Sequence, residues 1–70
     1  MKDITIDTDY IRLDAALKLA DVVQSGGHAK VIILGGMVKV NGEVCTMRGK
    51  KMRNGDIASF DGTDIRVNHR

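Results

Sequence analysis

The 70-residue sequence has no proline, no tryptophan, one cysteine and only two other aromatic residues. The single thiol of Cys45 excludes an intramolecular disulfide and any zinc site built from several cysteines, and we expect it to be buried as a small apolar side chain. No apolar run approaches the roughly 18 residues that a membrane-spanning helix needs. A hydrophobic core must therefore stabilise the fold, and the length predicts one domain covering residues 1–70.

The groups that catalysis or metal binding require are also missing. The chain has no Ser/His/Asp arrangement and no phosphate-binding P-loop, and it is too small to enclose a substrate. His28 and His69 lie 41 positions apart without a neighbouring cysteine or carboxylate pair, so we expect two surface residues and no metal site. The sequence predicts a protein that is not an enzyme and has no cofactor.

Residues 1–4 lack the apolar core of a signal peptide, so we expect the protein in the cytoplasm. A reducing compartment agrees with the lone thiol. We also expect a monomer that makes no contact with membranes and takes no small-molecule substrate.

Positive charge is gathered in the middle third of the chain. Positions 28–54 carry six Lys or Arg residues and one acid, Glu43, a local balance of 6 − 1 = +5 in a chain whose net charge is only +2. A charge of one sign concentrated in this way attracts phosphate backbones. The six cations are Lys30, Lys39, Arg48, Lys50, Lys51 and Arg53.

Hydrophobic spacing predicts two short helices early in the chain. Residues 4–6 alternate apolar and polar, which predicts a short strand at a sheet edge. Apolar residues then recur with helical spacing over about 12–22, after acidic and hydroxyl residues at 7–9 that could cap a helix. A second apolar set begins at Ala29 and predicts another helix that ends at Gly35-Gly36.

The second half of the sequence is rich in strand signals. Asn41-Gly42 between alternating apolar residues predicts a tight hairpin over 38–45. A basic loop over 46–55 follows, and the segments 57–60 and 65–67 predict a second strand pair. Helices separated in this way from an antiparallel sheet predict an α+β fold, with two short helices packed on a small, mainly antiparallel sheet.

The ordered set of these segments resembles the S4 RNA-binding domain, and more closely the small bacterial proteins that consist of an S4 domain alone. The resemblance covers about residues 10–67, the expected core of the domain. It implies the αL-motif fold and non-catalytic binding to structured RNA, which we expect to be ribosomal RNA or a ribosomal precursor. The residues that carry the resemblance are Arg12-Leu13-Asp14, Leu17, Ser25 to Lys30, Gly36 to Gly42, Arg48-Gly49-Lys50-Lys51 and Asn54 to Ile57.

The resemblance also implies where RNA binds, namely at the start of the second helix, the first hairpin and the loop after it. Glycines at the helix start leave backbone N–H groups open to a phosphate. Many S4 domains carry a basic residue and an acid where this chain has Gly26 and His28, which shifts weight to Lys30 and the 48–53 loop. The candidate RNA-binding residues are Gly27, His28, Lys30, Lys39, Arg48, Lys50, Lys51 and Arg53.

The small number of aromatic side chains indicates which kind of RNA the chain would bind. Proteins that read unpaired bases stack them on several exposed rings, and this chain has only Tyr10 and Phe60. Recognition of the shape and phosphates of folded RNA therefore fits the sequence better.

Simpler interpretations stay open for several of these residues. Gly26-Gly27 can serve only to break the chain between helices, and the run 48–53 can be a solvated loop. Arg12 can simply solvate the first helix, and Arg53 can pair with Asp56.

Two other functions remain as alternatives. A protein-interaction module could present the basic residues to an acidic partner. β-Grasp sulfur carriers share the Val-Asn-Gly hairpin, but they need a C-terminal Gly-Gly, whereas this sequence ends with residues 67–70, Val-Asn-His-Arg.

Overall fold

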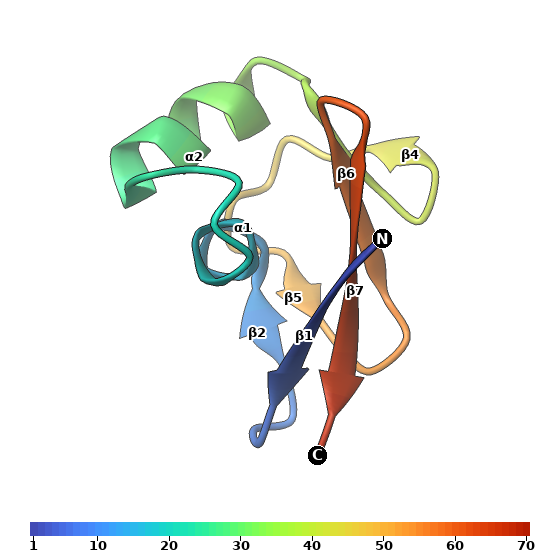
Figure 1. The fold of residues 1–70 in the computed structure, drawn as a ribbon. Helices are drawn as coiled ribbons and strands as arrows, with labels where there is room; N and C mark the ends of the chain where they lie inside the picture. The colour runs from blue at the N-terminus through green and yellow to red at the C-terminus, as the bar shows by residue number, and fades with distance from the viewer.

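A computed structural model describes all residues, 1–70, as two helices packed on one face of a sheet, with a separate pair of short strands beside the first helix (Figure 1). This arrangement confirms the α+β fold expected from the sequence. The elements in chain order are β1 (Lys2–Ile6), β2 (Ile11–Arg12), α1 (Leu13–Leu19), α2 (Gly26–Leu34), β3 (Val38–Val40), β4 (Glu43–Val44), β5 (Lys51–Met52), β6 (Ile57–Phe60) and β7 (Thr63–His69).

The main sheet has five strands in the order β1-β7-β6-β3-β4. Its pairings are antiparallel except that of β1, which runs parallel to β7 with Ile4 opposite Val67. Strand β1 is therefore an edge strand, as the sequence predicted. The first and last strands lie side by side in Figure 1, so the pairing joins the two ends of the chain.

The core lies between the helices and the sheet and consists of 16 buried residues, all of them apolar. Leu13 and Leu17 of α1 and Ile33 of α2 are fully buried, as is Ile65 at the centre of β7. No polar side-chain atom is buried without a hydrogen-bond partner. Neither helix is long and apolar enough to cross a membrane.

Helix α2 follows the sequence prediction closely, whereas α1 does not. The Ser25 side chain caps α2, and the helix ends at Gly35 as expected. Helix α1 is shorter than the predicted 12–22 because Arg12 still belongs to a strand and Asp21, with φ of 62°, takes a left-handed conformation. No side chain caps the start of α1, so the prediction that residues 7–9 cap it is wrong.

Asn41 and Gly42 form the predicted hairpin turn between β3 and β4, with φ of 52° and 87°. Positive φ at both central positions is the signature of the turn that Asn-Gly favours. The Asn41 amide also joins this turn to the next strand, since its oxygen accepts from Ile57 N–H at 2.9 Å and its nitrogen donates to Asp56 at 3.1 Å. The residue therefore shapes the turn and fixes its place against β6.

The parallel β1–β7 pair carries a hydrogen-bonded carboxylate on its surface. Asp3 Oδ1 accepts from Asn68 Nδ2 at 3.0 Å and from Arg66 Nε at 2.8 Å. The Asn68 hydrogen bond and then the Arg66 contact lower the Asp3 pKa below its ordinary value of 3.8. Because the folded pKa is the lower one, the carboxylate stabilises the fold above about pH 4, and this contribution disappears as the pH falls through the folded pKa.

We expect Asp3→Asn to reduce the dependence of stability on pH. The variant has no carboxylate to protonate here, so its melting temperature should fall less than that of the parent between pH 7 and pH 3. Asp64→Asn is the matched control, because Asp64 is exposed and its side chain makes no hydrogen bond. Equal losses of melting temperature on acidification in Asp3→Asn and the parent would contradict this role.

Candidate functional site

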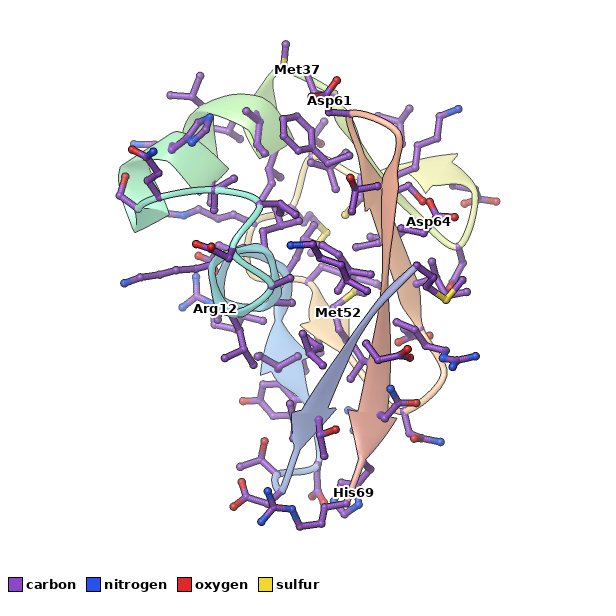
Figure 2. The ribbon with its side chains drawn as sticks, in the orientation of Figure 1. Arg12, Met37, Met52, Asp61, Asp64 and His69 are labelled. Carbon is purple, nitrogen blue, oxygen red and sulfur yellow. The ribbon has the colours of Figure 1, made fainter.

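Strands β2 and β5 pair to form a two-stranded antiparallel ribbon beside α1, with Ile11 opposite Met52 and Arg12 opposite Lys51. Met52 is fully buried and Ile11 is partly buried against the core. Successive side chains along a strand point to opposite sides. The residues that flank Ile11 and Met52 in the sequence therefore point outward. Figure 2 shows Met52 directed into the interior and Arg12 outside, next to α1.

The outward side of the ribbon carries three cations and one ring, and we call it the ribbon face. All four side chains are exposed. The Lys51 Nζ lies 4.9 Å from the centre of the Tyr10 ring, and the Arg53 guanidinium carbon lies 5.7 Å from it. These distances are those of cation–π contacts. The ribbon face consists of Tyr10, Arg12, Lys51 and Arg53.

The Arg53 side chain is not neutralised by Asp56. The Asp56 carboxylate instead accepts a hydrogen bond from the Arg53 backbone N–H at 2.8 Å, and the guanidinium makes no ion pair. The alternative in which the two side chains pair is therefore wrong. The positive charge of Arg53 remains available at the surface.

Residues 48–50, which we call the basic turn, are held against the start of α1. The Leu13 N–H donates to the Lys50 carbonyl at 2.8 Å, and the Asp14 N–H donates to the Arg48 carbonyl at 3.1 Å. These bonds satisfy N–H groups that a helix start leaves without partners. The expected loop over 46–55 is thus wrong in part, because two hydrogen bonds hold its turn against α1 and strand β5 lies within it.

Arg12 connects the basic turn with the ribbon face. A Cβ atom added at Gly49 would lie 3.7–3.9 Å from the Arg12 guanidinium, so that group rests on the turn. Arg12 also forms an ion pair with Asp14 at 3.2 Å. The structure therefore brings Arg12, the basic turn and β5 together on one surface.

The start of α2 contributes a second group of sequence-predicted residues. Ser25 Oγ accepts from the His28 N–H at 3.2 Å, and the first turn contains no acid. Gly27, His28 and Lys30 are exposed. The positive end of the helix dipole and the Lys30 ammonium both favour an anion at this end of the helix.

Lys39 lies elsewhere. Its neighbours Val38 and Val40 are buried under the helices, and Lys39 is exposed on the opposite side of β3. Its cross-strand neighbours there are Ser59 and Val44. The sheet face that carries Lys39 is left uncovered by the helices, whereas the ribbon lies on the helix side (Figure 1). Lys39 therefore lies on the opposite side of the sheet from the ribbon.

The remaining hollows do not form an enclosed site. The hollow beside β4, of about 490 Å³, is open to solvent and is lined by residues that include Val44, Cys45, Met47 and Lys50. Cys45 is half-buried, not buried as expected, and its thiol donates to the Met47 carbonyl at 3.7 Å. No group of three or more His, Cys, Asp or Glu side chains is placed to hold a metal ion.

Comparison with known families identifies this architecture. A model of the S4 domain matches residues 4–68, nearly the whole chain. The chain belongs to the S4 domain family. It is 48% identical over 59 residues to the Bacillus subtilis (strain 168) protein named Probable ribosome maturation protein RlbA, with 84% of this chain and 83% of that protein covered.

The S4 fold also matches a solved relative. The chain is 38% identical over 58 residues to YbcJ of Escherichia coli (strain K12). This match covers 83% of this chain and 83% of YbcJ. The solution structure of YbcJ superposes with a TM-score of 0.75 and 33% identity, covering 97% of this chain and 87% of that one. That structure is described as revealing an αL motif involved in RNA binding.

Sequence reasoning missed the ribbon and therefore two residues of its outward face. Arg12 was interpreted as a helix residue, and Tyr10 was counted only as one of few rings. The signal was present in two three-residue segments, 10–12 and 51–53, each with an apolar residue between two polar or aromatic ones. Segments this short form recognisable strands only when they pair with each other in the folded protein, and the sequence alone does not show that pairing.

Proposed function

We propose that this S4 domain binds structured RNA without catalysing a reaction. The observation that carries the proposal is the joined surface of the ribbon face and the basic turn. Three cations lie on the ribbon face and two in the adjoining basic turn, and only one of the five, Arg12, has a carboxylate partner. The five are Arg12, Arg48, Lys50, Lys51 and Arg53.

The chemistry of this surface suits phosphates. Arginine can donate two parallel hydrogen bonds to one phosphate, and lysine acts as a compact point charge. The backbone beneath these side chains is fixed by the β2–β5 pairing and by the two hydrogen bonds to α1. A fixed backbone lowers the ordering cost on binding, so more of the attraction is expressed as affinity.

We propose that the start of α2 adds a second contact through Gly27, His28 and Lys30, because a helix N-terminus attracts a phosphate. Lys39 projects from the other sheet face, and we expect it to contribute less than the ribbon cations. The exposed rings are too few for reading a run of unpaired bases. The preferred ligand is therefore folded RNA that is recognised by its phosphates and its shape.

The relatives support this proposal and indicate which class of RNA the partner belongs to. RlbA is named for ribosome maturation, and the YbcJ motif is described as involved in RNA binding. We therefore propose ribosomal RNA or its precursor as the partner, and a cytoplasmic site of action. An acidic protein partner is the competing candidate, since the same cations would attract it.

Crosslinking in intact cells distinguishes the two candidates. The tagged protein should be recovered with covalently bound RNA, and sequencing of that RNA should return ribosomal sequences. Nuclease treatment before capture should remove the partner. A crosslinked partner that survives nuclease and contains no RNA would contradict the proposal and indicate a protein contact.

A further inference from the structure

Tyr10 is the one aromatic side chain on the ribbon face. Its exposed fraction is 39%, whereas the other ring, Phe60, packs partly against the core. The Tyr10 carbonyl accepts a hydrogen bond from the Thr8 hydroxyl at 2.8 Å, which helps to fix the backbone that carries the ring. The ring contacts both Lys51 and Arg53.

We propose that Tyr10 is a positioning residue, whose ring holds the Lys51 and Arg53 cations in place for contact with an RNA phosphate. The inference rests on the proposed function and extends it to a residue that would not itself need to touch RNA. Long cationic side chains on a short surface strand lose rotamer freedom when they bind. A partner that restricts them beforehand reduces this loss.

The kind of group that holds Lys51 and Arg53 determines how much of their positive charge stays available to a phosphate. A carboxylate would also hold the two cations, but it would cancel their charge and compete with phosphate for their N–H groups. An aromatic ring attracts a cation through its quadrupole and carries no net charge. Lys51 and Arg53 are thus held by the ring while both keep their full charge and make no ion pair.

Two substitutions at Tyr10 separate the ring from its hydroxyl. Tyr10→Phe keeps the ring, so its affinity for a fluorescent RNA hairpin at about 0.1 M salt should match that of the parent. Tyr10→Leu removes the ring without changing the charge, and affinity should fall about two- to fivefold. In a Lys51→Ala, Arg53→Ala background, the Tyr10→Leu change should have no further effect, because the groups that the ring positions are gone.

A measurement without RNA tests the positioning itself. Proton NMR of the free protein should show ring-current shifts on the Lys51 and Arg53 side chains in the parent and in Tyr10→Phe, and these shifts should vanish in Tyr10→Leu. Thermal melts of both variants report whether the fold is intact.

Three results would overturn the inference. These are absent ring-current shifts, a Tyr10→Leu affinity equal to that of the parent, or an equal loss in Tyr10→Phe, which would assign the effect to the hydroxyl. A parent that binds no RNA would instead refute the proposed function, and the NMR experiment would still decide whether the ring positions the cations.

Discussion

Replacing Arg48, Lys50 and Lys51 together with alanine is expected to weaken binding to folded RNA by roughly 100- to 500-fold at about 0.1 M salt. Each cation that neutralises a phosphate releases counterions, which favours binding by roughly five- to eightfold at this salt concentration. Three such contacts multiply to the stated range. Fluorescence anisotropy with a labelled RNA hairpin measures the change.

The matched control removes three positive charges from other places. Lys18→Ala, Lys39→Ala and Arg70→Ala combined lower the net charge by the same amount but leave the ribbon face and the basic turn intact, and none of these three side chains makes an ion pair. We expect a much smaller loss of affinity. The melting temperatures of both triple variants should stay near that of the parent, because exposed substitutions change stability little. Equal losses of affinity in the two triple variants would show that only net charge matters.

Met52→Ala is expected to lower the free energy of unfolding by about 2–5 kcal/mol, the cost of a large-to-small change in a core. Met52 is fully buried and anchors the ribbon to the core. A 70-residue domain has a total stability of roughly 3.5–10 kcal/mol, so this change removes a large part of it. Urea unfolding followed by circular dichroism measures the loss.

A second methionine in the same segment supplies the control. Met47 is 65% exposed, and Met47→Ala should change stability by no more than about 0.5 kcal/mol. Met52→Leu keeps the volume and should cost less than about 1.5 kcal/mol. If Met52→Ala were as stable as Met47→Ala, the ribbon would not be anchored by Met52, and its face would not be fixed.

The sequence was sufficient to predict the hairpin turn, the end of α2 and the edge strand, because interactions between neighbouring residues determine each of them. Asn41-Gly42 predicted the hairpin because few residue pairs accept positive φ at both positions. Gly35-Gly36 predicted the end of α2, and the short alternation over 4–6 predicted an edge strand. Each of these features depends on a few neighbouring residues, and those residues are visible in the sequence.

The features that the sequence did not reveal depend on pairing between distant segments. Strand β1 near the start of the chain pairs with β7 near its end. The five residues of β1 do not indicate which distant strand they will pair with. Strands β2 and β5 have two residues each and are about 40 positions apart. The prediction started helix α1 one residue too early, because Arg12 fits either a helix start or a strand and only its pairing with Lys51 decides between them.

The candidate site was foreseen in its composition but not in its geometry. The charge of segment 48–53 predicted the basic residues, yet not that the turn is bonded to α1 or that Tyr10 contacts two of the cations. Lys39 was grouped with them by its position in the sequence. The alternation of β3 instead turns it to the uncovered sheet face.

We propose that four or five cations of the ribbon face and the basic turn each neutralise a phosphate of folded RNA. The most direct test is the affinity of the parent protein for an RNA hairpin between about 50 and 200 mM salt. The logarithm of the association constant should fall against the logarithm of salt concentration with a slope of roughly −3 to −4.5. A slope near zero over this range would contradict the account.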